Sequence, residues 1–143
     1  MLVKDLMTAN VMTISPEASL TDIGKILKEK RISGLPVTDQ NGNLVGVVTL
    51  TDLLRILNRI YKWKGLERRD GLEPKFSDMF EHEKASAKVS DIMTKSVVTL
   101  SVDDALDDVM RIMFENQIHT IPVTEEGRIV GVIGKRDLIT ACF

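Results

Sequence analysis

Apolar residues recur three and four positions apart in two similar stretches of the chain, and this spacing predicts two amphipathic helices. The first apolar stripe consists of Leu20, Ile23, Ile26 and Leu27. The second consists of Leu106, Val109, Met110 and Met113. Ser19 and Asp22 have the spacing of a capping box, which predicts that the first helix begins there. Asp103 and Asp104 place negative charge before the second stripe, so we expect them to open the second helix.

Short apolar runs separated by turn residues predict extended segments around these helices. The expected extended segments are residues 11–14, 35–37, 44–48, 97–100, 121–123 and 129–133. Turns at residues 39–42 and 125–127 join the paired segments into two hairpins. The first turn contains Asn41-Gly42, a pair that tolerates positive φ and favours tight turns.

Each hairpin is followed by another helical pattern. We expect helices to begin near Thr51 and near Arg136. The first of them runs to about Trp63 and ends at Gly65, because glycine favours a helix terminus.

The order of elements occurs twice because the sequence itself is duplicated. The residues VKDLMT at 3–8 return as VSDIMT at 89–94, which is 89 − 3 = 86 positions later. The chain therefore predicts an α/β (α+β) fold of two tandem β-α-β-β-α repeats. We expect them to share one core, to pack about a pseudo-twofold axis and to form clefts between them. The predicted organisation is a first repeat over 1–61, a charged insert over 62–88 and a second repeat over 89–143.

The insert has no counterpart in the repeat. Its charges favour a solvated linker with a short helix. The alternative is a partner-docking arm that uses the aromatic residues Tyr61, Trp63, Phe76 and Phe80. His82 lies between Glu81 and Glu83, where solvated charge is the simpler interpretation than a weak metal site.

Composition narrows the function. The chain has 43% hydrophobic and 28% charged residues and a net charge of −2, which favours a globular protein and disfavours nucleic-acid binding. It contains no apolar run long enough to span a bilayer and no signal peptide, so we expect a cytoplasmic protein without a membrane partner. A single cysteine, Cys142, fits a reducing compartment. No catalytic triad, metal-ligand cluster or phosphate-binding loop occurs, so we expect neither an enzyme, nor a metal, nor a cofactor.

The strand-to-helix junctions carry the best candidate chemistry. In the sequence GVVTLTD at 46–52, Thr49 and Asp52 can cap a helix, or they can bind the phosphate and the ribose hydroxyls of a nucleotide. The second junction, GVIGKRD at 131–137, has Gly134 in place of the threonine and keeps Asp137. The capping-box explanation therefore fails there, which favours a ligand role for Asp137.

Three basic residues near the second junction have two interpretations each. Lys135 and Arg136 are either solvated surface charges or phosphate contacts. His119, at the start of the second hairpin, is either structural or a phosphate neighbour, and the corresponding position in the first repeat is Ser33.

The duplicated motifs resemble a tandem pair of cystathionine-β-synthase (CBS) domains, also called a Bateman module. The resemblance rests on the VxD(I/L)MT opening, the apolar-Pro-Val-Thr hairpin and the closing GV(V/I)xxxDL of each repeat. It implies a regulatory module that binds AMP, ADP, ATP or S-adenosylmethionine as a regulatory ligand, pairs into a homodimer and acts on an effector protein that the sequence does not identify.

The resemblance also implies which residues would contact the ligand. It assigns the ribose to Asp52, with Thr49, in one cleft and to Asp137 in the other. The opening segment of the opposite repeat would close each cleft, and the start of each hairpin would contact adenine and phosphate. The remaining implied ligand-binding residues are Thr8, Val11, Ile32, Ser33, Leu35, Pro36, Thr94, Ser96, Val97, Ile118, His119, Thr120, Ile121, Pro122, Lys135 and Arg136.

Two other interpretations stay open. The chain could be a structural module that dimerises and docks a partner while its clefts remain empty. Nucleic-acid binding through Lys62, Lys64, Arg68 and Arg69 is disfavoured by the interspersed acidic residues.

Overall fold

The computed structural model describes residues 1–67 and 81–143, with residues 63–67, 82, 83 and 85 described by their backbone only. The elements of the first half are α1 (Val3–Leu6), α2 (Leu20–Lys30), β1 (Gly34–Thr38), β2 (Leu44–Thr49) and α3 (Leu50–Glu67). Those of the second half are α4 (Glu81–Ser86), α5 (Val89–Ile92), β3 (Leu100–Ser101), α6 (Leu106–Asn116), β4 (Thr120–Glu125), β5 (Arg128–Gly134) and α7 (Lys135–Cys142). This is the mixed α and β fold that the sequence predicts.

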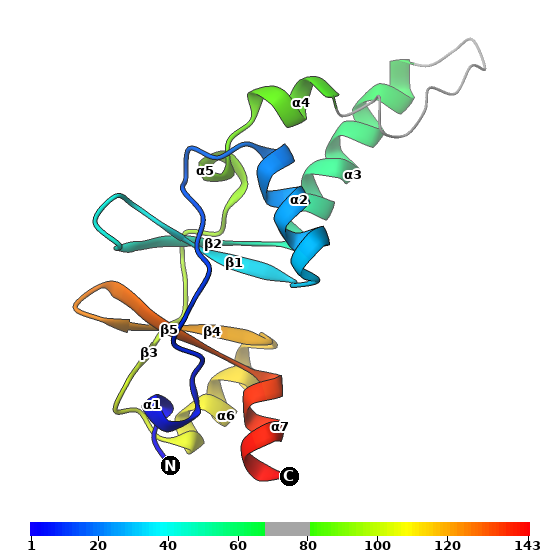
Figure 1. Cartoon of the computed structure of the whole chain (residues 1–143). Coiled ribbons are helices and arrows are strands. Elements are labelled where there is room, and N and C mark those ends of the chain that lie inside the picture. The colour runs from blue at the N-terminus through cyan, green and yellow to red at the C-terminus, as the bar shows by residue number, and fades with distance from the viewer. Residues whose placement is uncertain (68–80) are drawn as a thin grey trace.

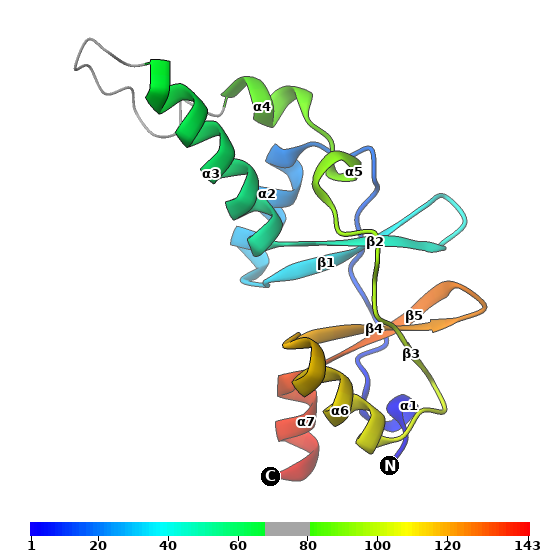
Figure 2. The same cartoon turned by 180° about the vertical axis from the view of Figure 1, so that it is seen from behind.

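Two small sheets lie at the centre of the molecule, and the helices cover their outer sides (Figure 1). Helices α2, α3 and α4 lie on the outer side of the β1–β2 sheet, and α6 and α7 lie on that of the β4–β5 sheet (Figures 1 and 2). The two repeats therefore face each other through their sheets, as the predicted pseudo-twofold arrangement requires.

Both predicted hairpins are present. Strands β1 and β2 pair antiparallel, as do β4 and β5, and β3 adds to β4 in parallel. The expected extended segments before the helices pair less than predicted. Residues 11–14 contribute one isolated parallel bridge, Ile14 to Val37, and β3 is limited to Leu100–Ser101.

The local sequence predicted the start of α2 correctly but not the start of α6. Ser19 caps α2 as predicted, since its Oγ accepts a hydrogen bond from the Asp22 N–H at 3.1 Å. The prediction that Asp103 and Asp104 open the next helix is wrong. Asp104 instead accepts the Ser101 N–H at 2.7 Å in the preceding turn, and α6 begins at Leu106.

Two further helix predictions are wrong. Helix α3 continues past Gly65 to Glu67, because glycine weakens a helix without obligatorily ending it. Met110 is 41% exposed. It belongs to the predicted buried stripe of α6, but the contacts of that helix with the core come from the buried Val109 and Met113 and from the partly buried Leu106 and Ile112.

The expectation of one shared core is also wrong, because the structure has two main cores with exchanged parts. Val3 and Leu6, at the start of the chain, pack in the core of the second repeat. Val89, at the start of the second repeat, packs in the core of the first. Backbone hydrogen bonds hold both exchanges, from the Val3 N–H to the Asp104 oxygen and from the Val89 N–H to the Ala18 oxygen, each at 2.8 Å. Neither repeat has a complete core without the other.

Candidate functional site

The exchanged opening segments bring a threonine of each repeat to the strand-to-helix junction of the other. Thr94 and Val47 exchange two backbone hydrogen bonds, both 2.9 Å long. Thr8 and Val132 make the equivalent pair at 2.8 and 2.9 Å. These bridges need close approach of two backbones, which Gly46 and Gly131 allow because they have no Cβ.

Asp52 lies at the first of these junctions and is 3% exposed. Its Oδ2 accepts the Thr49 N–H at 2.8 Å and the Thr49 hydroxyl at 3.1 Å. Its Oδ1 accepts the Thr94 hydroxyl and an Arg55 N–H, each at 3.2 Å. The Thr49–Asp52 capping box therefore forms, and the same carboxylate links the two repeats through Thr94.

Asp137 occupies the equivalent place at the second junction with fewer partners. Its Oδ1 accepts the Thr8 hydroxyl at 3.0 Å, and its Oδ2 accepts the Gly134 N–H at 2.7 Å. Half of the capping box thus survives without a threonine, because the carboxylate still satisfies the N-cap N–H. The argument that Gly134 removes the capping explanation for Asp137 is wrong in this respect.

A cleft of about 500 Å³ lies between the repeats beside the Asp52 junction. This volume is within the usual range for small-molecule sites. The cleft is lined by eleven of the predicted residues: Ser33, Leu35, Pro36, Thr49, Thr94, Ser96, Val97, Ile118, His119, Thr120 and Pro122. Residues that were predicted to lie together, although up to 89 positions apart in the chain (Ser33 and Pro122), therefore line the same cleft.

Several predicted residues do not line this cleft. Asp52 itself is buried and not part of the wall, although it is bonded to the lining residues Thr49 and Thr94. Ile121 is fully buried in the core of the second repeat, and Ile32 packs against the core of the first. Lys135 lines a different hollow, between α6 and α7, and Arg136 is exposed on α7. Thr8 and Asp137 lie at the opposite junction, and Val11 lies in the segment that follows Thr8.

The cleft also contains residues that sequence reasoning missed. They are Val47, Thr51, Asn116, Gln117 and Val132, whereas Gly34 and Val98, which also line the cleft, belong to the hairpin start and the opening segment that the resemblance places there. Asn116 and Gln117 end α6, where Gln117 has φ 53° and turns the chain toward the second hairpin. The predicted cleft residue His119 could have indicated them. It lies two positions after Gln117, and the end of a helix that directly precedes a cleft residue also borders the cleft.

The charge of the cleft is low. Among the described lining residues, His119 is the one titratable side chain, and the rest are apolar, hydroxyl or amide residues. His119 is exposed, and its backbone oxygen accepts the Lys135 N–H at 3.2 Å. The pKa changes that the structure resolves lie away from the cleft, at Asp39 in a hairpin turn and at Lys88 before α5.

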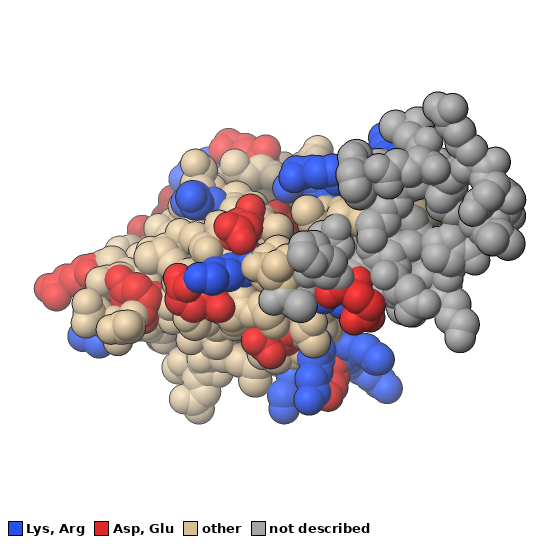
Figure 3. All heavy atoms as spheres, turned by 90° about the horizontal axis from the view of Figure 1, so that it is seen from above, with Lys and Arg blue, Asp and Glu red and all other residues tan. Residues whose placement is uncertain are grey.

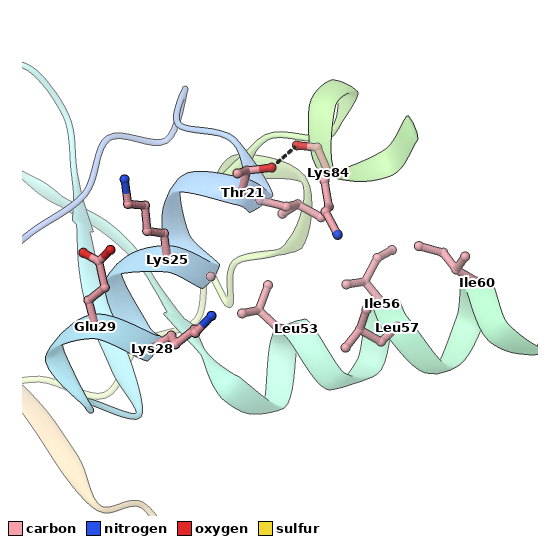
Figure 4. A pocket seen from close by; sticks show the side chains of 11 residues that line it. Thr21, Lys25, Lys28, Glu29, Leu53, Ile56, Leu57, Ile60 and Lys84 are labelled. Carbon is pink, nitrogen blue, oxygen red and sulfur yellow. Dashed lines mark hydrogen bonds between the residues drawn. The ribbon is translucent and has the colours of Figure 1, made fainter. Parts of the chain in front are cut away.

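Each repeat also has a groove outside the cleft. The groove between α2 and α3, about 480 Å³, has an apolar wall of Leu53, Ile56 and Ile60 (Figure 4). Thr21 at its margin donates a hydrogen bond to the Lys84 oxygen at 3.3 Å (Figure 4). The groove between α6 and α7, about 610 Å³, is lined in part by the exposed Phe114, Ile139 and Phe143.

The remaining sequence predictions concern metals, membranes and nucleic acids. The described residues contain no cluster of three or more His, Cys, Asp or Glu side chains that could hold a metal ion. In the same residues, no helix is long and apolar enough to cross a bilayer. Basic and acidic side chains are intermingled on the face seen in Figure 3. Phe76, Phe80, Arg68 and Arg69 lie outside the described residues, as do the side chains of Trp63, Lys64, His82 and Glu83.

Comparison with known proteins identifies the repeated unit. A family profile described as the CBS domain matches residues 3–59 and 89–143. The protein MJ1426 of Methanocaldococcus jannaschii is 28% identical over 99% of this chain and 90% of its own length. Some relatives are longer, and the chain spans 22% of the inosine-5'-monophosphate dehydrogenase of the same organism.

Two solved structures are similar over almost the whole chain. The structure of CBSX2 in complex with AMP has a TM-score of 0.75 at 30% identity and covers 98% of this chain and 94% of that one. The CBS domain pair of protein MJ0100, in complex with 5-methylthioadenosine and S-adenosyl-L-methionine, has a TM-score of 0.74 at 26% identity and covers 99% and 94%.

Proposed function

The chain belongs to the CBS-domain family as a tandem pair, and from this premise we propose that it is a regulatory module that reversibly binds an adenosine-containing ligand between its repeats. The observation that carries the proposal is the cleft beside Asp52, whose walls come from both repeats. The adenosine compounds in the CBSX2 and MJ0100 structures support the class of ligand. The module performs no chemistry on the ligand.

We assign the parts of the ligand by the chemistry of the walls. The ribose donates to Asp52, because a carboxylate oxygen accepts hydrogen bonds from hydroxyl groups. The base lies among the apolar side chains of Val97, Ile118 and Pro36. The phosphate lies near the start of α3 and His119, since a helix N-terminus attracts anions.

The low charge of the cleft favours a ligand with few phosphates. His119 is the one lining group among the described residues that can carry positive charge, so it can balance a monophosphate better than a triphosphate. We therefore expect AMP to bind this cleft more tightly than ATP. Lys135 and Arg136 begin α7 beside Asp137, and this favours phosphate binding at the second junction if that junction is used.

The regulatory output is a change in how the two repeats are arranged. A ligand that contacts Thr49 on one repeat and Thr94 and His119 on the other binds one arrangement more tightly than others. The helix faces support a homodimer as the assembled form. Leu54, Phe114 and Ile139 are 66%, 78% and 57% exposed on the outer helices, where a second copy could cover them.

Calorimetric titration tests the proposal. Ligand-free protein is titrated with AMP, ADP, ATP, S-adenosylmethionine and NAD, and saturable binding of an adenosine compound is expected. Asp52→Asn should weaken binding about 10- to 100-fold, the loss expected for hydrogen bonds to a charged group. Asp107→Asn is the matched control, because Asp107 is exposed on α6 and is not among the residues that line this cleft. Asp137→Asn reports in the same way on the second junction.

The alternative is a structural module that docks a partner and keeps its clefts empty. The exposed side chains of Leu54 and Tyr61 on α3, beside the insert, favour this alternative. Flat titrations with all five compounds, together with loss of partner binding when residues 64–84 are deleted, would support docking over sensing.

A further inference from the structure

The carboxylate of Asp52 has no acceptor position left for a ribose. A carboxylate offers about four positions for hydrogen-bond donors, two on each oxygen. Thr49 occupies both on Oδ2 through its N–H and its hydroxyl, and Thr94 and Arg55 occupy those on Oδ1. A diol can bind this carboxylate only after one of these donors leaves.

The second junction shows that this saturation is not inherent in the fold. From the described residues, Asp137 accepts one bond on each oxygen, from Thr8 and from Gly134, which leaves about two positions open. Thr8 is the counterpart of Thr94, so the threonine contact is common to both junctions. The difference lies in the missing hydroxyl at Gly134 and in Thr140, which stands where the first repeat has Arg55.

The four donors around Asp52 differ in how easily they leave. The Thr49 N–H is fixed by the backbone at the start of α3, and the Thr49 hydroxyl also accepts the Asp52 N–H at 3.3 Å. Thr94 is held by its two backbone hydrogen bonds to Val47. The side chain of Arg55 is 64% exposed and reaches Asp52 with a single N–H at 3.2 Å, so its guanidinium regains water when it leaves.

We propose that Arg55 is a latch on the Asp52 cleft: its guanidinium competes with the ligand's ribose for Oδ1 of Asp52 and must swing into solvent when the ligand binds. This inference rests on the proposed binding of an adenosine-containing ligand in that cleft. Arg55 thereby lowers the affinity of this cleft and leaves the Asp137 junction unaffected. It is a positioning residue, because it acts on the ligand through Asp52.

Removing the guanidinium while keeping an unbranched apolar side chain tests the latch. Arg55→Met and the wild type are titrated with adenosine and with 2′,3′-dideoxyadenosine. Adenosine is used because it carries the ribose without a phosphate, so the lost charge does not alter a direct attraction to the ligand. Arg55→Met should bind adenosine about 1.5- to 5-fold more tightly, the value of a largely exposed ion pair. Dideoxyadenosine, which lacks both competing hydroxyls, should bind both proteins equally.

Three comparisons separate the latch from other effects. Arg59→Met is the matched control, because Arg59 is an exposed arginine one turn further along α3. It removes the same charge and should leave adenosine affinity unchanged. Arg55→Lys retains a cation at the site and should restore most of the competition. The gain should persist in the Asp137→Asn background, where the Asp52 cleft is the remaining site.

The outcomes distinguish this inference from the proposed function. Equal adenosine affinity of the wild type and Arg55→Met, or an equal gain for adenosine and its dideoxy analogue, would overturn the latch and leave the nucleotide sensor intact. Tighter binding in Thr94→Val, without a gain in Arg55→Met, would also overturn it, because Thr94 would then be the donor that leaves. If neither AMP nor adenosine binds to any of these proteins, the proposed function and the latch are both overturned.

Discussion

Replacing Gly46 by alanine should weaken the connection between the two repeats. A Cβ built at Gly46 lies 2.7 Å from the Met93 Sδ and 2.9 Å from the backbone oxygen of Thr94. The Met93 side chain can rotate away from the new methyl group. The Thr94 oxygen cannot move freely, because it accepts the Val47 N–H at 2.9 Å in the bridge that joins the repeats.

The expected loss of stability follows from these contacts. Gly46 does not have the positive φ found at Gly42 and Gly127, so alanine can adopt its backbone conformation and the steric contact decides the effect. Overpacking of a buried site costs about 1–3 kcal/mol. Loss of the two Thr94–Val47 hydrogen bonds, at about 0.5–1.5 kcal/mol each, gives a similar value. In a chain of this size the melting temperature should fall by roughly 4–10 °C.

Urea unfolding of Gly46→Ala beside Gly24→Ala measures this effect against a matched control. A Cβ at Gly24 meets no atom within 4 Å, and Gly24 lies inside α2, so the same change should stabilise the protein by about 0.5–1 kcal/mol. Adding Met93→Ala to Gly46→Ala removes the contact with sulfur but not the one with the Thr94 oxygen, and should recover no stability. Wild-type stability of Gly46→Ala, with the expected gain in Gly24→Ala, would refute the reasoning from close backbone approach.

Two other predictions concern pH and assembly. The Asn43 N–H donates to Asp39 and lowers the pKa of this carboxyl below its ordinary value, so Asp39 contributes stability above its unfolded pKa that is lost as the pH falls through the lowered one. Unfolding midpoints measured from about pH 7 to pH 2 should therefore fall less in Asp39→Asn than in the wild type, and parallel curves would contradict this assignment. Phe114→Glu, which places a charge on the exposed apolar part of α6, should shift the proposed homodimer to monomer in sedimentation equilibrium. An unchanged mass would place the dimer interface elsewhere.

Local sequence was sufficient wherever neighbouring residues decide the conformation. The Ser19–Asp22 capping box starts α2, and the two hairpins form between the expected runs, because these features depend on contacts within a few residues. The same reasoning failed for Asp104, since the choice between capping α6 and bonding the Ser101 N–H depends on where β3 ends. It also failed at Gly65, where a helix-weakening residue did not stop α3.

The sequence predicted many of the residues that line the cleft, but it did not predict all of the hydrogen bonds that they make. Duplication and family resemblance together pointed to eleven residues that line the cleft, although neither Lys135 nor Ile121 lies on its wall. The spacing of Asp52 and Arg55 on one helix is compatible with their ion pair, but no sequence pattern indicated the contact of Thr94 with the same carboxylate oxygen. That contact depends on the arrangement of two segments from different repeats around one carboxylate.

The sequence by itself determined the duplicated α and β architecture, because hydrophobic spacing, caps and turn residues act over short distances and occur in both halves. Only the tertiary structure decided that Val3 completes the second core and Val89 the first, since the apolar side chains at the start of each repeat are compatible with packing on either one. That exchange carries Thr94 to Asp52 and Thr8 to Asp137. The contact of each carboxylate with a threonine of the other repeat is therefore a consequence of three-dimensional packing between distant segments, which the order of residues along the chain does not reveal.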